Sequence, residues 1–211
     1  MSNPLPARKR RQAETRTALL DAAIRLCAER GLEDPSIDEI AAEAGYTKGA
    51  FYANFSSKHD LFLAMIDVRF AVVIDEMEVA LGKDGDDFAI ARFAAEDFIR
   101  LIHAQPGDAG LFFKFVAYAS READFRDRLA ERYRDVQSRA TEIYRRWSAT
   151  FPAEPPLPLE EITTMVFAMA NGFLLEQQIN PDLSGEIHGQ MLAIFLRGLA
   201  ATAYGWEPDA D

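Results

Sequence analysis

The sequence predicts an all-α protein, and three observations indicate this fold class. Apolar residues recur at three- and four-residue spacing along most of the 211 residues, as they do on the buried side of an amphipathic helix. No segment shows the strict apolar and polar alternation that is typical of a half-buried strand. Capping sequences, glycines and prolines divide the chain into segments of helical length. We therefore expect about nine helices.

The N-terminal segment predicts two helices joined to a sharp turn. The first covers residues 15–30 and ends at Gly31. Ser36 and Glu39 then form an S-x-x-E capping box, which indicates the start of a short second helix. Gly45 follows after only a few residues and can adopt the left-handed conformation that turns the chain.

Thr47 caps the next predicted helix, which runs to about residue 53. Its first turn holds a cation, Lys48, followed by the two small residues Gly49 and Ala50. Small side chains let a helix approach another molecule's backbone closely. Residues 36–58 therefore predict a compact helix-turn-helix, and the first turn of its second helix can approach another molecule's backbone closely.

The rest of this segment separates a buried face from an exposed one. Phe51 and Phe55 are four residues apart and should pack inward, which leaves Tyr52 and Asn54 able to make contacts. Ser57 and Asp60 cap the following helix, and Lys58 lies in its first turn, where a cation opposes the helix dipole. We expect a phosphate, rather than helix stability, to explain Lys58.

The remaining two thirds of the chain predict a larger helical domain. An acidic, glycine-containing break follows the first of its helices, and a proline cluster at residues 152–158 prohibits helix before the last two. We place the domain boundary between residues 1–60 and 61–211. The helices expected in the second domain cover residues 61–81, 88–104, 111–120, 124–150, 159–179 and 184–204.

Of the last two helices, the first has one apolar stripe and the second has two, and a helix that is apolar on two sides needs two packing partners. One partner can be the chain's own core and the other a second copy of the chain, as in a homodimer. The residues expected at its interface are Ile162, Met165, Ile187, Met191, Ile194 and Gly198.

Charge is divided unevenly along the chain, whose formal net charge is −11. Residues 1–60 contain nine basic and nine acidic residues, so the remainder carries the whole excess of negative charge. Within the first part, Arg8, Lys9, Arg10 and Arg11 form a basic arm before the first helix. A polyanion would be attracted to this arm and repelled elsewhere.

Several classes of protein are not favoured. No apolar stretch approaches the ~20 residues that span a bilayer, and the N-terminus lacks the apolar core of a signal peptide, so we expect a cytoplasmic, nucleoid-associated protein with no membrane partner. The single cysteine, Cys27, gives no disulfide and no metal-ligand spacing. The acidic residues of the long helix are interpreted as a solvated face, and no cofactor or metal is expected; these are Asp124, Asp127, Glu131 and Asp135.

The stretch SIDEIAAEAGYTKGAFYANFSSK resembles the DNA-binding module of the TetR family of bacterial transcriptional regulators. The resemblance covers roughly residues 12–62. It implies that the helix beginning at Lys48 enters the major groove of a palindromic double-stranded DNA operator, bound by a dimer. Asn54 stands where many relatives carry histidine, and Ala53 is too small to reach far, so base specificity does not transfer from any relative.

The resemblance also implies roles for single residues. Ser36, Thr47, Tyr52 and Lys58 match positions that hold phosphates, while Lys48, Gly49, Ala50 and Asn54 match positions that approach bases. Arg11, in the basic arm, would add a phosphate contact. The expected DNA-binding residues are therefore Arg11, Ser36, Thr47, Lys48, Gly49, Ala50, Tyr52, Asn54 and Lys58.

In this family the larger domain encloses a small-molecule effector that changes DNA affinity. Polar residues among apolar neighbours are the better candidates for such a pocket, because aromatic residues at helical spacing are more often core. The candidate pocket residues are His103, Tyr118, Met169, Asn171, Phe173 and Gln177.

The leading interpretation is therefore a ligand-responsive transcriptional regulator, most simply a repressor. An architectural or partner-binding protein of the same fold, without a small-molecule sensor, is the alternative. An enzyme is not expected, because His59, His103 and His188 lie in separate elements and no phosphate-binding loop or nucleophile elbow occurs.

Overall fold

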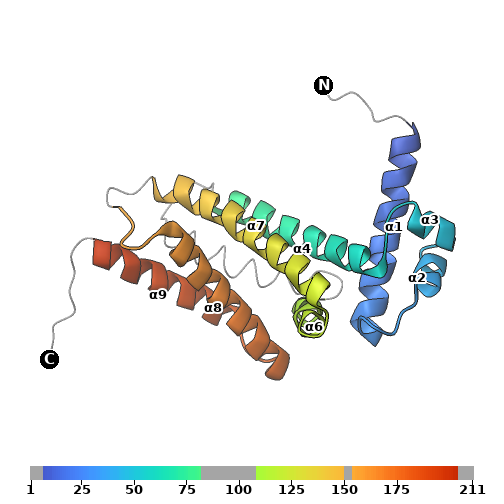
Figure 1. The fold of residues 1–211 in the computed structure, drawn as a ribbon. Coiled ribbons are helices and arrows are strands. Elements are labelled where there is room, and N and C mark those ends of the chain that lie inside the picture. The colour runs from blue at the N-terminus through green and yellow to red at the C-terminus, as the bar shows by residue number, and fades with distance from the viewer. Residues whose placement is uncertain (1–6, 82–107, 150–153, 204–211) are drawn as a thin grey trace. The chain divides into compact units, whose positions relative to one another are not determined.

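The computed structural model describes residues 7–81, 108–149 and 154–203, and the regular elements within them are all α-helices (Figure 1). This confirms the all-α fold class for the described part of the chain. The helix expected at residues 88–104 lies outside the described residues. The helices are α1 (Ala7–Arg30), α2 (Ile37–Glu43), α3 (Lys48–Tyr52), α4 (Lys58–Leu81), α6 (Asp108–Ala119), α7 (Ala123–Ser148), α8 (Leu159–Ile179) and α9 (Gly185–Ala203).

The helix boundaries follow the predicted ones closely, with one exception. α8 has the predicted bounds, and α6, α7 and α9 differ from their predictions by a few residues. α1, however, begins at Ala7 rather than at residue 15. Residues 7–14 are rich in Arg, Lys, Gln, Ala and Glu, which favour helix without forming an apolar stripe. Apolar periodicity alone could not detect this extension.

The chain divides into two compact units. The first consists of residues 1–69 and 105–129, and the second of residues 70–104 and 130–211. The first unit thus contains the predicted helix-turn-helix together with the beginning of α4, α6 and the beginning of α7.

In the first unit, α2 and α3 lie against α1, as Figure 1 shows. Phe51 and Phe55 are buried here, as predicted, and the two rings lie 5.6 Å apart between centroids. α6 also packs on α1, where the Lys114 ammonium donates to the Ala28 carbonyl at 2.7 Å. A cation suits the C-terminal end of a helix, where carbonyls lack intrahelical donors.

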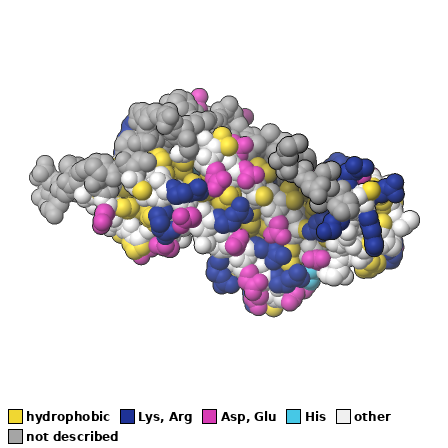
Figure 2. Space-filling model, turned by 90° about the horizontal axis from the view of Figure 1, so that it is seen from above, with side chains coloured by type: hydrophobic (Ala, Val, Ile, Leu, Met, Phe, Trp, Pro, Cys, Tyr) yellow, Lys and Arg dark blue, Asp and Glu magenta, His cyan; other side chains and the backbone are white. Residues whose placement is uncertain are grey.

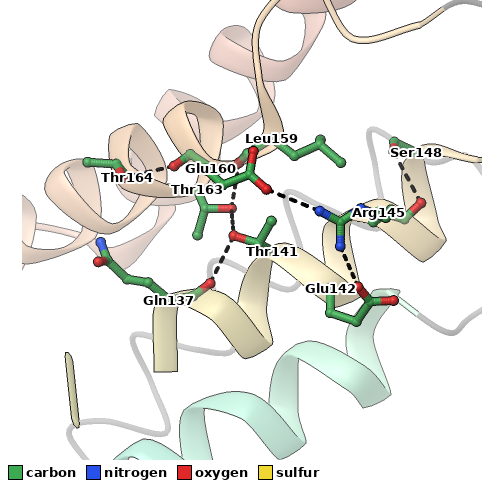
Figure 3. A network of polar contacts seen from close by, with 9 residues as sticks. All are labelled: Gln137, Thr141, Glu142, Arg145, Ser148, Leu159, Glu160, Thr163 and Thr164. Atoms are coloured by element: carbon green, nitrogen blue, oxygen red, sulfur yellow. Dashed lines mark hydrogen bonds and ion pairs between the residues drawn. The ribbon is translucent and has the colours of Figure 1, made fainter. Parts of the chain in front are cut away.

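In the second unit, α8 and α9 lie side by side, joined by a short connection (Figure 1). Their inner faces meet α7 in a core that includes Tyr144, Val166, Leu192 and Leu196. Figure 3 shows a polar network beside it: the buried hydroxyls of Thr141 on α7 and Thr163 on α8 lie 2.9 Å apart. This hydrogen bond fixes the contact between two helices through side chains that have no access to water.

On the face that Figure 2 shows, acidic and basic side chains lie among one another over much of the described surface, and basic side chains gather at one end of it. On α7 the four acidic residues expected on a solvated face are all exposed, which confirms that interpretation; they are Asp124, Asp127, Glu131 and Asp135. In the described part of the chain, no three His, Cys, Asp or Glu side chains are placed to hold a metal ion together.

Candidate nucleic-acid interface

The helix-turn-helix is held in shape by reciprocal capping at the start of α2. The backbone N–H of Glu39 donates to the Ser36 hydroxyl oxygen at 3.2 Å, and the Glu39 carboxylate accepts from the Ser36 backbone N–H at 2.8 Å. The predicted capping box is therefore confirmed. The Arg30 guanidinium, followed by the hydrogen bonds from Ser36, lowers the pKa of Glu39 to about 2. The carboxylate that closes this cap is consequently charged at any ordinary pH.

Gly45 makes the turn between α2 and α3, as predicted. Its φ of 76° lies in the left-handed region that favours glycine. The backbone N–H of Gly45 donates to the Ala42 carbonyl, and that of Tyr46 donates to the Ala41 carbonyl at 2.8 Å. This is the Schellman arrangement that satisfies the last carbonyls of a helix. It sets the angle at which α3 leaves α2.

α3 is short and presents an exposed first turn. The Thr47 hydroxyl accepts from the Ala50 backbone N–H at 3.3 Å, which confirms Thr47 as the N-cap. Lys48 and Gly49 are exposed, and a Cβ built on Gly49 would meet nothing closer than the Thr47 hydroxyl at 3.7 Å. Internal packing therefore does not require glycine here. Tyr52, one turn later, is 52% exposed.

Asp38 contributes a carboxylate to this surface, which sequence reasoning missed. The Lys48 ammonium lies 3.0 Å from the Asp38 carboxylate, and both side chains are more than half exposed. The hydrogen bond to Asp38 raises the pKa of Lys48. The two residues are ten positions apart on different helices, so no local sequence pattern indicates this ion pair.

Asn54, which the sequence predicts to be available for contacts, has internal partners. Its side-chain amide nitrogen donates to the Ala50 carbonyl at 2.9 Å, and its side-chain oxygen is buried. Its backbone carbonyl accepts from the Arg16 guanidinium, which also lies over the Phe55 ring. Asn54 thus closes the end of α3 and ties it to α1.

Lys58, for which the sequence predicts a phosphate contact, also has an internal partner. Its ammonium donates to the Glu33 backbone carbonyl at 2.9 Å and lies 5.5 Å from the centroid of the Phe62 ring. Burial lowers the pKa of Lys58. Lys58 connects the start of α4 to the loop before α2, a contact across 25 residues that the sequence could not indicate.

The basic residues before residue 15 form the first turns of α1 rather than a separate arm. Arg8, Lys9, Arg10 and Arg11 are all exposed. Arg10 lies 3.7 Å from Glu14, and the backbone carbonyl of Arg11 accepts from the Thr15 hydroxyl. The expected cationic surface is present, but a helix displays it.

The candidate effector residues do not form one described site. His103 lies outside the described residues, and Tyr118 belongs to the first unit, where its hydroxyl lies 2.8 Å from His59 Nε2. In the second unit, Asn171 donates to the Tyr133 hydroxyl at 2.7 Å, and buried Gln177 donates to the Leu183 carbonyl at 2.8 Å. The side chains of Asn171 and Gln177 therefore already make internal hydrogen bonds.

The other two candidates are part of the core of the second unit. Buried Phe173 packs against His188, with ring centroids 5.3 Å apart. Met169 packs against the buried cluster that contains Tyr144 and Leu196.

The expected dimer residues divide into buried and exposed ones. Ile162 is buried in its own chain, so its side chain has no surface left to offer a partner. The other expected residues lie on the exposed sides of α8 and α9; these are Met165, Ile187, Met191, Ile194 and Gly198. Leu175 and Ile179 on α8 are further large apolar residues exposed there, and sequence reasoning missed them.

Among the described helices, none is both long and apolar enough to cross a membrane.

A capped helix-turn-helix on a helical scaffold defines a class of DNA-binding transcriptional regulators. A model of the bacterial regulatory proteins of the tetR family matches residues 19–65, and a model of the C-terminal domain of BetI-type transcriptional repressors matches residues 91–203. The chain belongs to the TetR family of transcriptional regulators.

Individual relatives agree with this assignment. The chain is 37% identical over 89 residues to the transcriptional regulator AcrR of Shigella flexneri, covering 41% of each chain. It is 45% identical over 58 residues to the transcriptional repressor BepR of Brucella suis, covering 28% of each. The matches thus span less than half the length of these curated relatives.

A solved structure supports the fold over nearly the whole chain. The transcriptional regulator FadR of Bacillus subtilis, in complex with stearoyl-CoA, matches with a TM-score of 0.64 at 15% identity. The match covers 90% of this chain and 99% of that one.

Proposed function

We propose that the protein binds a palindromic operator in double-stranded DNA as a homodimer, represses transcription there, and is released by a small-molecule effector. One observation carries the DNA-binding part of this proposal. The exposed first turn of α3 presents Lys48, Gly49 and Ala50 on a helix whose two ends are fixed by capping hydrogen bonds. A rigid, short helix with a cation and little side-chain bulk fits the major groove.

The contacts divide between positioning and reading. Ser36, Thr47 and Tyr52 are exposed and lie at the starts of α2 and α3 or on the outer side of α3, where phosphates can be reached. Arg11 on α1 adds a further exposed cation. Lys48 and Tyr52 are four residues apart and so share one side of α3.

Asn54 and Lys58 are assigned a supporting role in this proposal. Asn54 holds the end of α3 and Lys58 holds the loop before α2, each through one N–H, and each has a further N–H that can donate to DNA. In this proposal they orient α3 in addition to making the DNA contacts expected of them.

The exposed apolar sides of α8 and α9 support the dimer. These surfaces combine large apolar residues on both helices, and water-exposed groups of this kind mark interaction sites when they are contiguous. A two-fold axis through them would relate two copies of α3. A spacing of about 34–36 Å between the copies would match successive major grooves on one side of the DNA. The exposed residues are Met165, Leu175, Ile179, Ile187, Met191 and Ile194.

The effector part of the proposal rests on similarity and composition. FadR, with the same fold, carries stearoyl-CoA, and the second unit of this chain is rich in large apolar side chains. The alternative, a regulator without a small-molecule sensor, is favoured by the internal hydrogen bonds of Asn171 and Gln177. A sensor would need to break these bonds or to use other residues.

Selection of bound DNA from a random pool, followed by release tests with a panel of metabolites and drugs, tests the proposal. We expect an enriched palindrome, and release by at least one compound. If the logarithm of the association constant for DNA did not change with the logarithm of the salt concentration, the proposed phosphate contacts would be contradicted. Each neutralised phosphate contributes about −0.9 to the slope of this dependence. An enriched palindrome that no compound releases would favour the alternative without a sensor. A promoter carrying the selected operator ahead of a reporter gene then tests repression.

A further inference from the structure

The carboxylate of Asp38 lies directly beside the cation of the proposed reading helix. Lys48 is the single basic residue of α3, whose sequence is KGAFY. Its ammonium lies 3.0 Å from Asp38, which occupies the first turn of α2. The positive end of the α2 dipole stabilises a carboxylate there. The cation therefore has a partner before any DNA arrives.

Other exposed cations of the same unit differ from Lys48 in this respect. Arg8, Lys9 and Arg11 are exposed on the first turns of α1 and, among the described residues, have no carboxylate within ion-pair distance. They can approach any phosphate without giving up a partner. Lys48 cannot.

This difference has a consequence for the kind of DNA that each cation favours. A phosphate that approaches Lys48 is repelled by the Asp38 carboxylate, which lies 3.0 Å from the ammonium, and competes with that carboxylate for the same cation. A base edge can satisfy both groups, because guanine O6 and N7 accept from a lysine and the cytosine N4 amino group donates to a carboxylate. The pair is therefore unfavourable toward a bare phosphate backbone and compatible with a suitable base pair.

Resting on the proposed function, we propose that Asp38 determines specificity by holding Lys48 away from phosphates, so that DNA lacking the correct base edge is bound more weakly. Repulsion of the wrong partner is a common source of specificity in recognition. In this scheme Asp38 lowers the affinity for unrelated DNA and does not lower the affinity for the operator.

The substitution Asp38→Asn should release Lys48 to contact a phosphate on any DNA. The slope of log K against log salt on non-specific DNA should then steepen by about 0.9, which gives an extra loss of about 3.5-fold between about 50 and 200 mM salt. At the low-salt end, non-specific affinity should rise about threefold or more, and the ratio of operator to non-specific affinity should fall by a similar factor.

The control is Asp21→Asn, which removes the same charge from the same unit. Asp21 is exposed on α1 and, in the part of the chain that the structure describes, has no ion-pair partner. Titrations against operator and scrambled duplexes separate the effect of the Asp38–Lys48 pair from the effect of net charge. The proteins titrated are the full-length wild type, both asparagine variants, Lys48→Ala and the Asp38→Asn/Lys48→Ala double variant. Melting temperatures check that each variant is folded.

The proposal requires that Asp38→Asn changes both the slope of log K against log salt and the ratio of operator to non-specific affinity, and that Asp21→Asn changes neither. It also requires that Asp38→Asn has no such effect in the Lys48→Ala variant. Equal behaviour of Asp38→Asn and Asp21→Asn would overturn it, since the effect would then be one of net charge. An effect of Asp38→Asn that remains in the Lys48→Ala variant would overturn the proposal as well. These outcomes leave the DNA-binding function intact, whereas a wild type that shows no salt-dependent DNA binding refutes the function and the inference together.

Discussion

The substitution Ile194→Asp should separate the proposed dimer into folded protomers. Ile194 is 70% exposed on α9, so its side chain contributes little to the core of its own chain. Complete burial of an isoleucine contributes about 1.5–3 kcal/mol, so burial of the exposed part in a dimer contributes about 1–2 kcal/mol per copy.

Two-fold symmetry doubles this effect, because the same residue is lost from both copies. The loss of about 2–4 kcal/mol raises the dissociation constant of the dimer by a factor of roughly 30 to 700. Burying a carboxylate in the apolar interface adds to this, so the figure is a lower bound.

Sedimentation velocity over nanomolar to micromolar concentrations measures the dissociation constant, and circular dichroism shows whether the helices remain. Val79→Asp is the matched control, since Val79 is 60% exposed on α4, outside the proposed interface. We expect Val79→Asp to dimerise as the wild type does. A dissociation constant of Ile194→Asp within threefold of the control, or a wild type that is monomeric at micromolar concentration, would refute the reasoning.

Three further predictions concern the reading helix, the core and acid stability. Lys48→Ala and Tyr52→Ala should weaken operator binding in a gel-shift assay while leaving the melting temperature nearly unchanged, because both side chains are more than half exposed. Thr163→Val should lower the free energy of unfolding by about 1–2 kcal/mol in urea titrations. Thr141→Val should lower the free energy of unfolding less in the Thr163→Val variant than in the wild type, because the two hydroxyls form a hydrogen bond with each other. The pKa of Glu39 is lowered from 4.5 to about 2, so the charged carboxylate stabilises the folded state above about pH 4.5. This stabilisation is lost as the pH falls from about 4.5 through about 2. The variant Glu39→Gln should therefore lose less stability than the wild type over this pH range.

Each of these has a contradicting result. An unchanged gel shift for both variants of α3 would remove the assigned contacts. A double threonine variant whose loss equals the sum of the single losses would show that the two hydroxyls act independently. An acid-unfolding profile of Glu39→Gln that parallels the wild type between pH 4.5 and about 2 would show that folding does not lower the pKa of the cap carboxylate.

Much of the first unit could be predicted because its decisive interactions are local. The Ser36–Glu39 capping box, the left-handed turn at Gly45 and the Thr47 cap each involve residues within a few positions of one another. Hydrogen bonds at such spacing depend on residue type and order, which the sequence displays directly.

The chemical environment of the site was harder to predict because its contacts are distant in sequence. Lys58 meets the Glu33 carbonyl, Asn54 is tied to Arg16, and Lys48 pairs with Asp38. Each contact depends on the angles at which helices cross, and these angles result from packing of the whole unit.

The sequence by itself determined the all-α class, the positions of most helices, the helix-turn-helix and the family resemblance. Periodicity and capping are properties of neighbouring residues, so they survive without a tertiary structure. Only the tertiary structure decided which apolar residues of α8 face inward, such as Ile162, and which remain exposed, such as Met165. It also decided that Lys48 meets a carboxylate, because an ion pair between two helices exists only where packing brings their surfaces together.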